Sequence, residues 1–72
     1  MFKNKLGEFL KEKRIKNNLY QRHVAEHLGV SIVSVSQYES GSSSLCIEGL
    51  FKVSKLLKFD LNEIYLFTMS EK

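Results

Sequence analysis

The sequence of 72 residues contains no proline, no tryptophan and only one cysteine. A single cysteine cannot form a disulfide within the chain, so no such cross-link stabilises the small core expected at this length. No apolar run approaches the roughly 18 residues that a membrane-spanning helix needs. The charged N-terminus also lacks the apolar segment of a secretory signal. We therefore expect a cytoplasmic protein in a reducing compartment, without membrane association.

Positive charge is missing from the middle of the chain. Residues 23–51 contain no lysine or arginine, whereas residues 1–22 contain seven basic and two acidic residues. The net charge of +3 therefore has its main source in the N-terminal part. A basic segment is typical of a protein that binds a polyanion such as DNA. A solvated helix face with ion pairs such as Glu12–Lys16 explains the same pattern.

Apolar residues recur with helical spacing, and strand-like alternation is scarce. We expect helices near residues 3–17, 21–28, 32–39 and 46–58, and a last one that Asp60 opens and that frays through 68–72. Segment 30–37 also fits an alternating strand, but such a strand would have no partner. The fold expected is all-α, a compact five-helix bundle in one domain over 1–69, with a frayed tail at 70–72.

The expected helix ends have local signals. Asn18 and Gly29 suit the ends of the first two helices, because both residue types accept a left-handed backbone. Ser31 is a good N-cap for the third helix, and Asp60 with Glu63 forms a capping box for the last. The inward positions expected from periodicity are Leu6, Leu10, Val24, Ala25, Leu28, Leu50, Val53, Leu57, Leu61, Ile64 and either Tyr65 or Leu66, with Phe9 and Lys13 flanking the first helix.

The second and third expected helices are joined by a short turn that contains glycine, which is the pattern of a helix-turn-helix. Ala25 lets the two helices cross closely, and Gly29 makes the tight turn. Val30 and Val35 fill the space between the helices. One face of the third helix is then held outward, where it can enter the major groove of DNA, which is ~12 Å wide.

Five segments, in order and at matching spacing, resemble the lambda-repressor-like (Xre/Cro-type) helix-turn-helix family over about residues 6–66. The segments are Leu6-Gly7-x-x-Leu10-Lys11-x-x-Arg14, Leu19-Tyr-Gln21-x-x-Val24-Ala25-x-x-Leu28-Gly29-Val30-Ser31, Val35-Ser36-x-Tyr38-Glu39-x-Gly41, Leu50-x-x-Val53-x-x-x-Leu57 and Asp60-Leu61-x-Glu63-Ile64. The resemblance implies a sequence-specific, double-stranded DNA-binding regulator of transcription, a repressor or autoregulator, with no enzymatic activity and no cofactor.

The resemblance also assigns roles to single positions. Those expected to contact bases are Ile32, Val33, Ser34 and Gln37. Those expected to contact phosphate are Lys11, Arg14, Tyr20, Gln21, Ser31, Ser36, Ser42 and Ser43. Those expected to hold the fold are Ala25, Gly29, Val30, Val35, Glu39 and Gly41. Arg14 and Glu39 resemble the pair that joins the first helix to the end of the third. The loop at 40–43 lies where the family offers backbone N–H groups to phosphate.

Some residues depart from the family pattern. Tyr20 replaces the usual serine or threonine before the second helix. Ile32 and Val33 are apolar at base-contacting positions, so they can pack on thymine methyl groups but cannot form a bidentate hydrogen bond. Gln37 can bind adenine N6 and N7. Direct base contacts are therefore expected to be few, with support from phosphate contacts and DNA shape.

The C-terminal segment 64–69 is more apolar than one helix face requires. We expect a homodimer interface formed by Leu56, Tyr65, Leu66, Phe67 and Met69. A symmetric dimer implies a near-palindromic operator with half-sites ~34 Å apart. The alternative for these residues is extra core in a monomer.

Other functions fit parts of the sequence. The apolar face of segment 30–47, which has no lysine or arginine and Glu39 as its one charged residue, suits a protein-interaction module on the same scaffold, antitoxin-like or an anti-repressor. His23-x-x-Glu26-His27 matches a zinc hydrolase pattern, but a catalytic zinc needs a third protein ligand. Cys46 lies near a helix start, where a redox-active thiolate is favoured, although a half-buried structural cysteine is the simpler expectation. No metal site and no small-molecule effector are expected.

Overall fold

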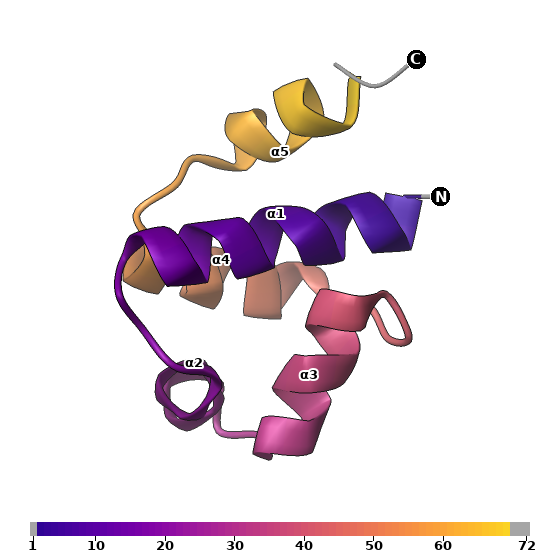
Figure 1. Cartoon of the computed structure of the whole chain (residues 1–72). Coiled ribbons are helices and arrows are strands. Elements are labelled where there is room, and N and C mark those ends of the chain that lie inside the picture. The colour runs from indigo at the N-terminus through magenta and orange to yellow at the C-terminus, as the bar shows by residue number, and fades with distance from the viewer. Residues whose placement is uncertain (1, 70–72) are drawn as a thin grey trace.

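The computed structural model describes residues 2–69, with side chains for residues 5–67. Its elements are α1 (Phe2–Lys16), α2 (Gln21–Leu28), α3 (Ile32–Ser40), α4 (Ile47–Leu57) and α5 (Leu61–Met69). α1 crosses the middle of the molecule, with α5 on one side of it and α2 and α3 on the other, while α4 packs behind it (Figure 1). The expected all-α, five-helix fold is confirmed, and segment 30–37 is not a strand. The tail expected at 70–72 lies outside the described residues.

The helix ends follow the local signals in the sequence. Asn18 and Gly29 have φ angles of 60° and 74°, and each ends a helix in the left-handed region. The Ser31 hydroxyl accepts the Ser34 N–H at 3.1 Å and caps α3. Cys46 was expected inside α4, but it precedes the helix as the N-cap, and its Sγ accepts a backbone N–H. None of the helices that the structure describes is long and apolar enough to cross a membrane.

The expected reciprocal cap at the start of α5 is present, although the Asp60 side chain accepts the N–H of Asn62 rather than that of Glu63. The Asp60 N–H donates to Glu63 Oε2 at 3.0 Å, and Lys13 Nζ lies 2.9 Å from Glu63 Oε1. The Asp60 N–H, followed by the Lys13 ammonium, holds the pKa of the Glu63 carboxyl below its usual value of 4.5. This one side chain therefore closes the N-terminus of α5 and joins α5 to α1.

The core is formed by apolar side chains from all five helices and from Phe59, in the link between α4 and α5. The buried members are Leu6, Phe9, Leu10, Val24, Ala25, Val35, Val53, Leu57, Phe59 and Ile64. Leu28, Leu50 and Leu61 are partly buried against them. The expectation that Tyr65 or Leu66 faces inward is wrong, because these side chains are 60% and 57% exposed. Phe67, one residue further on, packs against the core instead.

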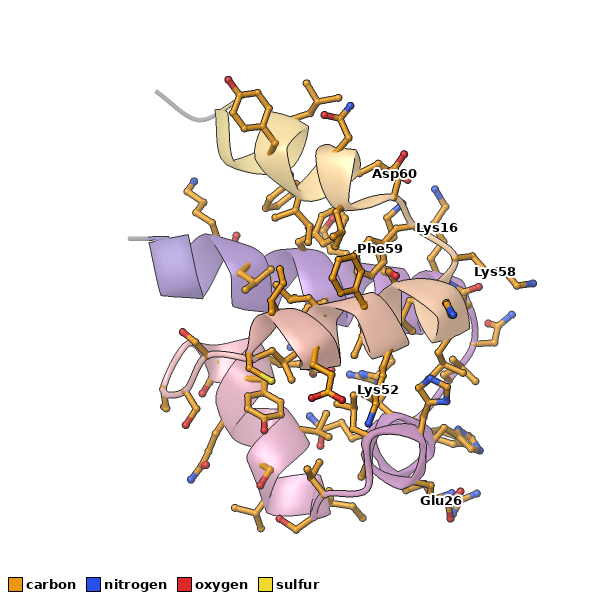
Figure 2. All side chains as sticks on the ribbon, turned by 180° about the vertical axis from the view of Figure 1, so that it is seen from behind. Lys16, Glu26, Lys52, Lys58, Phe59 and Asp60 are labelled. Atoms are coloured by element: carbon orange, nitrogen blue, oxygen red, sulfur yellow. The ribbon has the colours of Figure 1, made fainter. Side chains whose placement is uncertain are left out.

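An aromatic cluster joins the two ends of the chain. The ring of Phe9 lies 4.9 Å from that of Phe59 and 5.4 Å from that of Phe67, and both pairs meet edge to face. Figure 2 shows Phe59 between α4 and α5. Edge-to-face aromatic pairs contribute about 0.5–1.5 kcal/mol beyond the area that they bury. Phe9, expected only to flank the inward face of α1, is therefore a central core residue.

α1 and α3 touch backbone to backbone at Gly7. A Cβ atom added to Gly7 would lie 2.5 Å from the Glu39 carbonyl oxygen and 2.6 Å from that of Tyr38. No side chain other than hydrogen fits between the helices at this point. The close approach fixes the C-terminal turn of α3 against the first turns of α1.

Candidate nucleic-acid interface

α3 has a buried side and an outward side. Val35 is 2% exposed, whereas Ile32 and Val33 are 50% and 65% exposed. Ser36 and Gln37 are also exposed. These outward residues recur at i, i+1, i+4 and i+5, which places them on one face of the helix. We call Ile32, Val33, Ser36 and Gln37 the outer face of α3.

The inner side of α3 is held by a charged network. Arg14 donates from Nε to Glu39 Oε2 at 2.7 Å and from Nη2 to Glu39 Oε1 at 3.2 Å. The third Arg14 nitrogen, Nη1, donates to the Leu19 carbonyl oxygen at 2.9 Å. Gln21 Nε2 donates to Glu39 Oε1 at 3.1 Å. One carboxylate thus connects α1, the start of α2 and the end of α3.

This network changes the interpretation of two expected phosphate contacts. The Arg14 and Glu39 side chains are only 11% and 6% exposed, and every nitrogen of the guanidinium has a protein partner. Arg14 therefore orients α3 before any ligand binds. Gln21 supports the same carboxylate, a role that sequence reasoning missed because it joins positions 18 residues apart.

The turn before α3 uses its polar groups internally. Ser31 Oγ accepts the Ser34 N–H and also lies 3.1 Å from Ser34 Oγ. Ser31 is exposed and Ser34 is half-buried. Ser34, expected to contact a base, is thus engaged with the cap of its own helix.

The loop after α3 corrects one expectation. Gly41 has a φ of 87°, and the N–H groups of Ser42 and Ser43 donate to the Gln37 carbonyl oxygen at 2.9 and 3.2 Å. These two N–H groups satisfy the carbonyl at the end of the helix. The resemblance predicts that these N–H groups bind phosphate, but they are already bound within the chain. A phosphate contact at this loop therefore has to use the serine hydroxyl groups. Ser40 Oγ lies 3.1 Å from Ser42 Oγ.

The start of α2 carries an exposed aromatic and basic group. Tyr20 stacks on the ring of His23 at 5.6 Å, and the Arg22 guanidinium carbon lies 5.2 Å from the Tyr20 ring centre. The Tyr20 N–H donates to His23 Nδ1 at 2.9 Å, and the His23 N–H, which a serine or threonine hydroxyl would usually bind, donates to the Tyr20 carbonyl oxygen at 3.0 Å. Sequence reasoning omitted Arg22, although its position directly after Gln21 was a usable signal.

The remaining structural candidates occupy the expected places. Ala25 is buried between α2 and its neighbours, and Val30 packs partly buried against the core. Lys11 is exposed on α1. Among the expected dimer residues, Tyr65 and Leu66 are exposed, but Leu56 and Phe67 pack against the core of their own chain. The side chain of Met69 lies outside the described residues.

The H-x-x-E-H pattern does not form a metal site. His23 Nδ1 accepts a backbone N–H, and His27 Nε2 lies 2.9 Å from the Lys52 carbonyl oxygen. Across the part of the chain that the structure describes, no three histidine, cysteine or acidic residues are grouped to hold a metal ion. Cys46 is exposed and acts as a helix cap.

Comparison with known proteins finds one family model. A model described as helix-turn-helix matches residues 10–64. An HTH-type transcriptional regulatory protein, Ta1363 of Thermoplasma acidophilum, is 44% identical over 55 residues, which cover 76% of this chain and 17% of that protein. The cryptic phage CTXphi transcriptional repressor RstR of Vibrio cholerae is 32% identical over 60 residues, covering 83% of this chain and 54% of RstR. The chain thus spans about half or less of the length of these relatives.

The fold has a counterpart among solved structures. The crystal structure of the clp gene regulator ClgR from C. glutamicum superposes with a TM-score of 0.88 at 23% identity. The match covers 100% of this chain and 95% of that one. At this identity the likeness concerns the arrangement of the helices.

Proposed function

Because the chain belongs to the helix-turn-helix family, we propose that it regulates transcription by binding specific double-stranded DNA sequences with α3 in the major groove. The observation that carries this proposal is the outer face of α3. It projects from a helix that Val35, Gly7 and the Arg14–Glu39 pair fix from behind. Such a protein acts on DNA inside the cell, as a repressor or autoregulator, and needs neither a catalytic site nor a cofactor.

Base and phosphate contacts divide between α3 and its surroundings. Ile32, Val33 and Gln37 are proposed to contact base edges, with Ser34 in a secondary role because of its bond to the cap. The groups proposed to contact phosphate are Lys11, Tyr20, Gln21, Ser31, Ser36, Ser42 and Ser43, together with the Arg22 guanidinium. Phosphate contacts position a protein on the duplex, and base contacts select the sequence.

The direct test is selection of bound sequences from a random duplex pool by the purified protein. We expect enrichment of one motif, and binding whose logarithmic affinity falls linearly with the logarithm of salt concentration, with a slope near −0.9 per phosphate neutralised. No enrichment would exclude sequence-specific binding. Binding of a protein partner with little salt dependence would instead favour the interaction-module function, which the lack of cations in residues 23–51 supports.

Gln37 offers a single-residue test of the docking geometry. Gln37→Ala is expected to cost ~1–3 kcal/mol on the selected site and to relax the preference at one base pair. Asn62→Ala is the matched control, because Asn62 is an exposed amide on α5, across α1 from α3 (Figure 1). Equal losses in both variants, or unchanged specificity in Gln37→Ala, would show that Gln37 does not contact a base.

We further propose that the protein binds as a homodimer through the exposed side of α5, with a near-palindromic operator as the consequence. Tyr65 and Leu66 carry this proposal, since both are large and exposed. Leu66→Glu is expected to halve the mass measured by light scattering at micromolar concentration. Ile15→Glu, at an exposed apolar position on α1, is expected to leave the mass unchanged. A wild-type protein that is monomeric both free and on its operator would contradict the dimer.

A further inference from the structure

The side chains on the outer face of α3 restrict which base pairs the protein can recognise. We propose that each half-site is built around A·T pairs, with thymine methyl groups against Ile32 and Val33 and an adenine bound by Gln37 within about two base pairs of them. The inference rests on the proposed DNA-binding function and adds the chemical class of its target.

The attractive part of the argument is apolar. Half or more of the Ile32 and Val33 surfaces is open to water, and neither side chain packs into the core of its own chain. In the major groove only thymine offers a methyl group on its edge. Removing a methyl group from such a contact loses ~0.8 kcal/mol, which is about a fourfold change in affinity.

The second part concerns the groups that recognise G·C pairs. A bidentate contact to guanine is made by arginine or lysine, and the usual charged partner of the cytosine amine is a carboxylate. Residues 23–51 supply no such cation, and Figure 2 shows Lys52 of α4 directed toward α2, away from α3. The only carboxylate on α3 is that of Glu39, and both of its oxygens are bound to Arg14 or Gln21.

Among the remaining polar side chains of α3, the Gln37 amide is the one that favours adenine. Gln37 is exposed, and an amide can bind adenine N6 and N7 together. The rise of ~1.5 Å per residue places Gln37 about 6 Å along α3 from Val33. That separation is close to two base-pair steps of ~3.4 Å. The amide can therefore reach an adenine near the thymines that Ile32 and Val33 cover.

The test alters the DNA and leaves the protein unchanged. In the operator selected from the random pool, each thymine of the half-site is replaced in turn by deoxyuracil, which removes only the methyl group. We expect one or two positions to lose about fourfold in affinity each, and deoxyuracil in the flanks to have no effect. Replacing the adenine by 7-deazaadenine is expected to weaken binding of the wild type but not of Gln37→Ala.

A protein variant connects the lost methyl group to its partner. With Ile32→Ala or Val33→Ala, the matching deoxyuracil substitution is expected to change affinity less than twofold. Ile15→Ala, an exposed apolar position on α1, should retain the full fourfold sensitivity. Tight binding to a selected site with no deoxyuracil effect, or with a G·C core, would overturn the inference while the proposed function stands. Absence of any selected site would overturn both.

Discussion

Gly7 has less room for an added methyl group than Gly29 or Gly49. In Gly7→Ala the new Cβ would meet two carbonyl oxygens of α3 at 2.5 and 2.6 Å, about 0.9 Å inside ordinary contact. Neither oxygen can move without its helix. Overpacking of this kind costs ~1–3 kcal/mol. We expect a cost at the upper end of this range, because the contacted atoms belong to the rigid backbone of α3. Better helix propensity offsets at most about 1 kcal/mol, so the expected net loss is about 2 kcal/mol.

Gly49 supplies the matched control. It is also a buried helical glycine, but a Cβ there would meet Leu45 Cδ2 at 2.8 Å, the mobile end of a half-buried side chain. The Leu45 side chain can rotate away at little energetic cost. Gly49→Ala should therefore change the free energy of unfolding by less than about 1 kcal/mol, and the higher helix propensity of alanine favours the variant.

Thermal and urea unfolding, followed by circular dichroism, compare the two variants. For a domain of this size, about 2 kcal/mol corresponds to a fall in Tm of roughly 8–16 °C. We expect this fall for Gly7→Ala and a shift of only a few degrees for Gly49→Ala. A Gly7→Ala protein that melts at or above the wild type would refute the backbone contact between α1 and α3.

Three further outcomes follow from other contacts. Glu39→Leu should lower the free energy of unfolding in urea by about 3 kcal/mol, because it leaves a nearly buried guanidinium unpaired, and adding Arg14→Met should recover most of the loss; an unstable double variant would contradict this. Ala25→Leu should unfold or distort the domain by overpacking its helix crossing, so a normal melting curve would disprove the packing there. Glu63 accepts the Asp60 N–H, which lowers its pKa; its contribution is therefore present above about pH 4.5 and lost as the pH falls through the lowered value. A Tm measured between pH 2 and 7 should fall less steeply for Glu63→Gln, and parallel curves would argue against the capping role.

The helices could be predicted because their signals are local. Left-handed Asn18, the Ser31 cap and the Asp60–Glu63 box each depend on neighbours within four residues. The inward side of α3 could also be predicted, because Val35 was expected to fill the space between α2 and α3 and is buried there. Boundaries were accurate to about one residue for this reason.

The orientation of α5 could be predicted only in part from its own sequence, because Leu61 and Ile64 face inward as expected but Tyr65 and Leu66 do not. The apolar residues of α5 are distributed around the whole circumference of the helix, so their periodicity does not identify one inward face. Its rotation is decided by the contact of Phe67 with Phe9, across nearly the whole chain. The aromatic cluster was also not predicted, because Phe59 lies between two helices and belongs to no periodic pattern.

The candidate site divides along similar lines. The exposure of Ile32 and Gln37 could be predicted from their positions around the helix relative to Val35. The Arg14–Glu39 pair could be predicted only from the family resemblance. The part played by Gln21 in the same network depends on the angle at which α2 meets α3. The use of the loop N–H groups by the Gln37 carbonyl depends on how α3 ends.

The nearly buried pair of Arg14 and Glu39 restricts which mutations this protein can accumulate. If both codons were randomised together and folded survivors sequenced, arginine with glutamate and combinations of two apolar residues should dominate. Libraries varied at one codon alone should return almost only the original residue. The two positions therefore change jointly or not at all.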